Sequence, residues 1–98
     1  MDLSIIICTY NGADKIIKTI QSILAQVATC TRELIVVDNA STDGVAELAE
    51  KHLANHQIEN FRWKVIYEST PGLIHARLAG MKAAASDIML FCDDDNTL

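Results

Sequence analysis

The stretch ELIVVDNASTDGVAELAEKHL, residues 33–53, decides the fold. It opens with a continuous apolar and β-branched run, which is the pattern of a strand covered on both faces. Turn-forming residues follow, with Ser41 or Thr42 as the expected helix N-cap and Asp43 placed to favour the helix dipole. Apolar side chains then recur at helical spacing: Val45, Leu48, Ala49 and Leu53. A buried strand that leads directly into an amphipathic helix indicates an α/β protein.

The same alternation of strand and helix extends to both sides of this stretch. Further strands are expected over residues 3–8, 63–68 and 87–92, and the second of these has a more exposed pattern. A first helix is expected from residue 12 to about 27, with Asn11 as its N-cap and Asp14 near its exposed N–H groups. The third helix should follow STPGL and share one apolar face: Ile74, Leu78, Met81 and Ala85. The order βαβαβαβ predicts a three-layer α/β/α arrangement around a mainly parallel sheet.

Size and composition fit one globular unit. The chain has 98 residues, of which 50% are hydrophobic and 21% are charged. Its net charge of −5 argues against nucleic acid as a partner. The N-terminal apolar run is too short to span a bilayer and lacks the basic start of a signal peptide. Three cysteines without CxxC spacing predict free thiols in a reducing cytoplasm: Cys8, Cys30 and Cys92.

Polar residues gather where the predicted strands end. In parallel sheets with helices on both faces, ligands bind beyond the carboxyl ends of the strands. The candidates are Thr9, Tyr10 and Asn11 after the first strand, Asp38 and Asn39 after the second, and Asp93, Asp94 and Asp95 after the fourth. The acidic triplet could be a solvated turn, but the oxygen ligands of an Asp-x-Asp pattern suit Mg²⁺ or Mn²⁺. Such an ion would let an acidic protein bind a diphosphate.

Four segments carry a resemblance to a known family. They are IIICTYNG, LIVVDNASTDG, PGLIHARLAGMKAA and IMLFCDDDN. Together they resemble, in order and approximate spacing, the nucleotide-binding half of the family 2 glycosyltransferases. The similarity covers essentially the whole chain, residues 1–98, as a single partial domain. It implies the GT-A fold, the strand order 3-2-1-4, and a sheet that in this chain stops after the fourth strand.

The resemblance also implies a role for each candidate residue. Thr9, Tyr10 and Asn11 would line the nucleotide pocket, and the first two of these would contact the base. Asp38 would accept a hydrogen bond from a base N–H, with Asn39 beside it where the family often has a second aspartate. Arg77, on the third helix, would face the base or the diphosphate. The acidic triplet would serve the ribose and the metal: Asp93 near the ribose and as a ligand, Asp95 on the metal, and Asp94 in either task.

The implied reaction is sugar transfer from a UDP- or dTDP-sugar to an acceptor hydroxyl, and the implied acceptor is a glycan or a lipid-linked saccharide. Transfer with inversion needs a general base, and in the family that carboxylate comes from the second half of the domain. We therefore expect this chain to bind donor and metal but to be inactive alone, and to self-associate through the edge of its fourth strand. The expected location is the cytoplasm, and the full-length protein could lie against the inner face of the membrane.

Two other readings of the sequence stay open at this point. The chain could be a free-standing α/β module that binds a nucleotide or a partner without catalysis. It could also be a domain of the response-regulator type, in which an acidic cluster binds Mg²⁺ for phosphoryl chemistry. That type gathers its acids after the first and third strands and has a strand-end lysine, and neither feature is found here. Haloacid dehalogenase-like phosphatases differ too, because their Asp-x-Asp follows the first strand.

Overall fold

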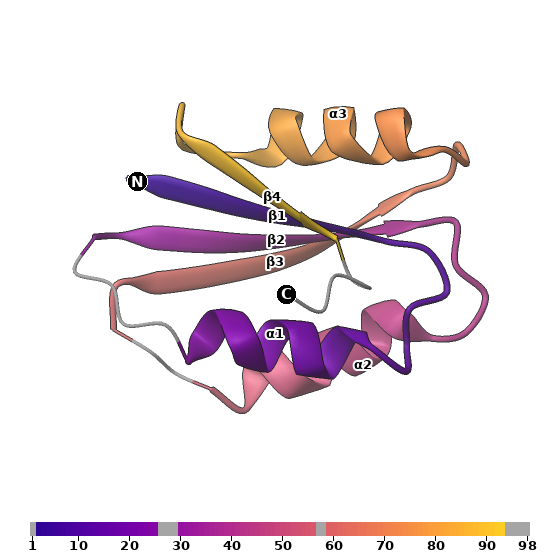
Figure 1. Ribbon diagram of the computed structural model, residues 1–98, viewed down its shortest axis with the longest axis horizontal. Coiled ribbons are helices and arrows are strands. Elements are labelled where there is room, and N and C mark those ends of the chain that lie inside the picture. The colour runs from indigo at the N-terminus through magenta and orange to yellow at the C-terminus, as the bar shows by residue number, and fades with distance from the viewer. Residues whose placement is uncertain (1, 26–29, 57–58, 94–98) are drawn as a thin grey trace.

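The computed structural model describes residues 2–25, 30–56 and 59–93, with Asp93 described by its backbone only. Strands and helices alternate along this part of the chain, as the sequence predicts (Figure 1). The strands are β1 (Leu3–Thr9), β2 (Arg32–Asn39), β3 (Phe61–Glu68) and β4 (Met89–Asp93). The helices are α1 (Ile16–Leu24), α2 (Val45–Ala54) and α3 (Leu73–Ala83). Of the helix expected to reach about residue 27, residues 26 and 27 lie outside the described part.

The four strands form one parallel sheet in the order β3-β2-β1-β4. Helices α1 and α2 cover one face and α3 covers the other, which gives three layers (Figure 1). The predicted layers and strand order are therefore confirmed. Strand β3 begins at Phe61, two residues earlier than expected, and β4 runs one residue further, to Asp93.

The continuous apolar runs of β1 and β2 are explained by the two covered faces. Alternate side chains of each strand point to opposite faces of the sheet. Ile5 and Ile7 of β1 pack toward α1 and α2, whereas Ile6 and Cys8 pack on the side of α3. Strand β2 divides in the same way, so both central strands need apolar residues at every position of their cores.

Helix α3 packs with a different face from the one its apolar pattern predicts. Ile74, Leu78 and Met81 are exposed, and Ala76 and Gly80 are the buried residues of the helix. The reason is close approach: a Cβ built on Gly80 would lie 2.5 Å from Cγ2 of Ile6 in β1. Small side chains let the helix backbone lie directly on the sheet, so the larger apolar residues point outward.

Two expected helix caps are also wrong. Helix α1 begins at Ile16 and not at residue 12, its N-cap position is Lys15, and it has no acidic residue in its first turn. Asn11 lies four residues further back with a positive φ of 50°. Helix α2 is preceded by Gly44 in the left-handed conformation, and neither Ser41 nor Thr42 caps it. Asp43 does support this helix as expected, because its Oδ1 accepts a hydrogen bond from the Val45 N–H (3.2 Å).

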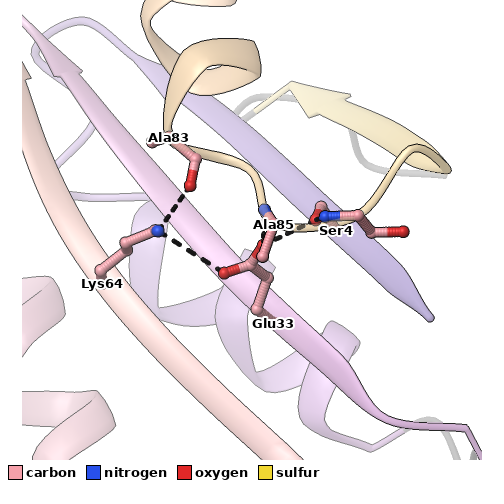
Figure 2. A network of polar contacts seen from close by, with 6 residues as sticks. Ser4, Glu33, Lys64, Ala83 and Ala85 are labelled. Atoms are coloured by element: carbon pink, nitrogen blue, oxygen red, sulfur yellow. Dashed lines mark hydrogen bonds and ion pairs between the residues drawn. The ribbon is translucent and has the colours of Figure 1, made fainter. Parts of the chain in front are cut away.

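A buried polar network holds the amino edge of the sheet together (Figure 2). The Glu33 carboxylate accepts hydrogen bonds from the Ser4 hydroxyl (2.7 Å) and the Ala85 N–H (2.6 Å), and it pairs with Lys64 (3.6 Å). Lys64 also donates to the carbonyl of Ala83 at the end of α3. Burial would raise the pKa of Glu33, but these donors and the ammonium outweigh it and lower that pKa. The network ties the α3–β4 connection to the starts of β1 and β2.

Candidate functional site

The register of the sheet brings the predicted strand-end residues to one edge. Thr9, the last residue of β1, lies beside Asp38 of β2, and Asp38 lies beside Tyr67 of β3. On the other side of β1, Cys8 pairs with Asp93, which ends β4. The carboxyl ends of β1, β2 and β4 therefore lie at the same edge, where a ligand of such a sheet would bind.

Asp38 is buried, and one of its two carboxylate oxygens is used in its own turn. Its Oδ1 accepts a hydrogen bond from the Ser41 N–H at 3.0 Å. Among the described residues, Oδ2 has no hydrogen-bond partner. The residue is thus a turn former that still presents one acceptor at the carboxyl edge, and this is what a contact with a base N–H requires.

Thr9, Tyr10 and Asn11 differ from one another in what they present. Thr9 is buried at the end of β1, whereas Tyr10 is 64% exposed. The Asn11 side chain binds the neighbouring loop: its Oδ1 accepts from the N–H of Thr42 (2.8 Å). The Asn11 N–H donates to Oγ of Ser41 (2.9 Å), so Asn11 joins the β1–α1 and β2–α2 loops.

Asp43 reinforces the same connection, and sequence reasoning missed this role. Its Oδ2 accepts from the N–H of Ala13 (2.9 Å), while its Oδ1 accepts from Val45. One carboxylate therefore supports the start of α2 and fixes the β1–α1 loop. The signal in the sequence is only an aspartate before a glycine, which predicts a turn and does not identify a partner thirty residues away.

Asn39 is also buried and is bound to the third loop of this edge. Its Nδ2 donates to the carbonyls of Glu68 (3.3 Å) and Thr70 (2.8 Å), and its Oδ1 accepts from the Gly72 N–H (3.0 Å). The loops that follow β1, β2 and β3 are thereby linked to one another. Asn11 and Asp43 join the first two loops, and Asn39, at the end of β2, binds the third.

Arg77 lies on the exposed side of α3, above the edge strand. Its guanidinium carbon is 5.7 Å from the centre of the Phe91 ring, a cation–π contact. Phe91 belongs to β4, two residues before Asp93. The aromatic ring therefore holds the arginine over the strand that ends at Asp93, and the sequence pattern did not single out Phe91 for this.

The comparison with known families shows to which family the chain belongs. The family model described as "Glycosyl transferase family 2" matches residues 4–98 of the chain. The chain belongs to glycosyl transferase family 2. The resemblance of the four sequence segments is thereby confirmed.

Solved structures of glycosyltransferases agree with this assignment. A mannosyltransferase, PcManGT, from Pyrobaculum calidifontis, solved with GDP-Man and Mn²⁺, is similar with a TM-score of 0.86 and 27% identity. The match covers 95% of this chain and 27% of that protein. TarS from S. aureus, solved with UDP, is similar with a TM-score of 0.83 and 30% identity over 97% of this chain and 28% of its own. The fold is that of the GT-A glycosyltransferases, as expected.

Curated relatives are much longer than this chain. A cholesterol galactosyltransferase of Borreliella burgdorferi is 27% identical over 96 residues, which are 98% of this chain and 25% of that protein. The glycosyltransferase AglE of Haloferax volcanii is 31% identical over 95% of this chain and 30% of its own length. The chain thus spans about a quarter of the curated relatives it matches.

The metal residues expected from the family pattern fall at the limit of what the structure describes. The backbone of Asp93 ends β4 beside β1, while Asp94 and Asp95 lie outside the described residues. Within the described residues no group of three His, Cys, Asp or Glu side chains could hold a metal ion. In the same part of the chain, none of the helices has the length and apolar character needed to cross a bilayer.

Proposed function

We propose that this chain is the donor-binding segment of a glycosyltransferase that moves a sugar from a nucleoside diphosphate to an acceptor hydroxyl. The observation that carries the proposal is the convergence of Thr9, Asp38 and Asp93 at one carboxyl edge in a member of glycosyl transferase family 2. Similar proteins solved with GDP-Man, UDP and UDP-GlcNAc support a nucleotide-sugar donor. UDP- or dTDP-sugars are our first choice of donor.

The proposed roles divide between base, diphosphate and metal. Thr9 and Tyr10 contact the base, beside the loop that Asn11 fixes. Oδ2 of Asp38, which has no hydrogen-bond partner among the described residues, accepts the base N–H. Arg77 faces the base or the diphosphate from α3. Asp93 lies near the ribose, Asp95 serves the metal on the diphosphate, and Asp94 shares either task. Asn39 was predicted to lie beside the base as well, and its carboxamide is hydrogen-bonded to Glu68, Thr70 and Gly72.

The donor set after β4 fits a divalent cation. Carboxylates separated by one residue supply the hard oxygen ligands that Mg²⁺ and Mn²⁺ prefer, and these ions take their remaining ligands from water and phosphate. Asp95 and Asp93 would hold the ion, with Asp94 in support. When bound, the ion neutralises the charge of the diphosphate. Mn²⁺ or Mg²⁺ is present in solved structures of similar glycosyltransferases, such as the glucosyl-3-phosphoglycerate synthase from Mycobacterium tuberculosis.

Further features of the reaction are proposed from the family alone. Transfer proceeds with inversion, and the general base and the acceptor site are contributed by sequence that this chain does not contain. The acceptor is a glycan or a lipid-linked saccharide, the protein is cytoplasmic, and the 98-residue chain alone binds donor without transferring sugar. Self-association of this chain through β4 belongs to the same proposal, because the described residues leave that strand at the edge of the sheet.

Calorimetry with nucleoside diphosphates tests the proposal. UDP, dTDP and GDP are titrated into the chain with Mn²⁺ and again with EDTA. We expect binding of at least one of them with the ion and none with EDTA, and we expect Asp95→Ala to abolish it. Asp87→Ala is the matched control, since Asp87 is an exposed carboxylate just before the other end of β4.

Each outcome of the titration is informative. Undiminished binding in EDTA would reject the metal bridge, and loss of binding in both variants would show that net charge and not the Asp-x-Asp pattern matters. No binding of any nucleotide with Mn²⁺ would contradict donor binding by this segment. Nucleotide binding by the longer protein without sugar transfer would favour the non-catalytic module instead.

A further inference from the structure

The side chain of Asn39 is hydrogen-bonded to the loop that joins β3 to α3. Only 5% of the residue is exposed. Its side chain makes three hydrogen bonds with described residues, and all three reach the end of β3 or the β3–α3 connection, 29 to 33 residues further along the chain. Both N–H groups of the carboxamide are committed to carbonyl oxygens, those of Glu68 and Thr70. The amide therefore cannot donate to a nucleobase unless this loop is released.

The loop that Asn39 holds is the one that starts α3. Oδ1 of Asn39 accepts from the N–H of Gly72, which precedes the first residue of the helix. The carbonyl of Gly72 in turn accepts from the N–H groups of His75 and Ala76 in the first turn. Gly72 has a φ of 126°, a conformation that residues other than glycine rarely adopt. The Asn39 amide holds this connection before the glycine, at the carbonyls of Glu68 and Thr70, and at the glycine N–H itself.

Helix α3 carries Arg77 one turn after this start. Because the helix is rigid, a shift of its first residues changes where the guanidinium lies relative to Phe91 and the carboxyl edge. A carboxamide is suited to this task, since it offers two donors and an acceptor in one plane. A carboxylate in its place would face two carbonyl oxygens without a proton to donate.

We propose that Asn39 is a positioning residue: it sets the entry of α3 and thereby the placement of Arg77 against the donor nucleotide. This inference rests on the proposed function for its second half, the contact with donor. Its first half, the control of the α3 entry, concerns the protein without ligand. Asp38 and Asn39 thus have separate tasks, although they are neighbours on one strand. Asp38 offers an acceptor to the ligand, and Asn39 shapes the wall of the site.

Two variants remove hydrogen-bond donors from the side chain to different extents. Asn39→Asp keeps the shape but removes both donors and adds a charge, and Asn39→Ser keeps one donor without a charge. Hydrogen exchange is measured on the 98-residue chain without ligand. We expect faster exchange over residues 69–77 in Asn39→Asp, an intermediate rate in Asn39→Ser, and no change in β1 or α1. Unchanged exchange over residues 69–77 in both variants overturns the proposal, and so does an equal increase throughout the chain in both.

Nucleotide binding supplies the second readout, with UDP and Mn²⁺ as the probe. Loss of the loop contacts should weaken UDP binding about tenfold in Asn39→Asp, which corresponds to about 1.4 kcal/mol, because Arg77 is then no longer held in place before binding. If Asn39 acts through Arg77, the same change in an Arg77→Ala background should have little further effect. Fully additive losses would show that Asn39 acts on the ligand independently, which overturns the positioning role.

The two readouts also distinguish failure of this inference from failure of the proposed function. If the unmodified chain binds no nucleotide, donor binding fails, while the exchange measurement still decides whether Asn39 sets the entry of α3. If the unmodified chain binds UDP and the variants show normal exchange, donor binding stands and the positioning role is refuted.

Discussion

Gly80 is the position at which the packing of α3 can be tested most directly. A Cβ at this residue would lie 2.5 Å from Cγ2 of Ile6 and 3.3 Å from Cγ2 of Val37. Both methyl groups are attached directly to the Cβ of a fully buried strand residue, so neither can swing away as the end of a flexible side chain could. In Gly80→Ala the helix itself must therefore move off the sheet.

Two opposing terms set the size of the effect. Alanine is favoured over glycine inside a helix by about 1 kcal/mol. Overpacking of a well-packed core costs about 1–3 kcal/mol, and contact with a central strand places Gly80→Ala at the upper end of that range. We expect a net loss of about 2 kcal/mol in the free energy of unfolding, measured by urea denaturation with circular dichroism. For a chain of this size, that corresponds to a fall of roughly 10 °C in Tm.

A double-mutant cycle shows whether the clash is the cause. Ile6→Ala removes Cγ2, so in that background Gly80→Ala should be neutral or stabilising by up to about 1 kcal/mol. Gly44→Ala is the control, because Gly44 has a φ of 78° and no heavy atom within 4 Å of the added Cβ. Its cost of about 1 kcal/mol comes from the backbone and should not depend on Ile6. If Gly80→Ala costs the same in both backgrounds, the reasoning about close approach is refuted.

Three further predictions concern the amino edge, the base contact and the edge strand. The lowered pKa of Glu33 means that its contribution to stability is complete above the ordinary value of 4.5 and is lost as the pH falls through the lower folded value. Unfolding measured from pH 6 to pH 3 should therefore show a shallower pH dependence in Glu33→Gln, and parallel curves would contradict this. Asp38→Ala should weaken UDP binding by about 1–3 kcal/mol in calorimetry, and equal affinity would reduce Asp38 to a turn residue. Light scattering should show self-association of the 98-residue chain that Leu90→Lys reduces, because Leu90 is an exposed residue of the edge strand β4; a monomer at all concentrations would exclude it.

The strands could be predicted from sequence because their signal is local. Continuous β-branched runs mark β1 and β2, and the register seen in the structure places Thr9 beside Asp38. The strand order needed the family resemblance, since a pattern of strands does not say which strand pairs with which. The candidate residues could also be predicted from local sequence, because they stand at the ends of recognisable strands.

The errors arise where distant residues take part. Asn11 is a residue type that often caps helices, but its side chain accepts a hydrogen bond from the N–H of Thr42. Helix α1 therefore starts four residues later than a cap at Asn11 would place it. The inner face of α3 was misjudged because apolar periodicity assumes that large side chains face the core. Close approach at Gly80 reverses this, and it depends on the position of Ile6, which the local pattern does not contain.

The position of β1 in the middle of the sheet has a consequence for the order in which the protein assembles. Strands β1, β2 and β3 are joined by crossovers of ordinary length, whereas β1 meets β4 only across some eighty residues of chain, as the bond from the Ser86 N–H to the Ser4 hydroxyl shows. Contacts between residues so far apart in sequence are costly to form early in folding. The first three strands can therefore assemble while one side of β1 is still unpaired. Asp93 reaches the carboxyl edge only when that last strand docks. A metal ion and a donor that bind at this edge, as we propose, would therefore favour completion of the sheet.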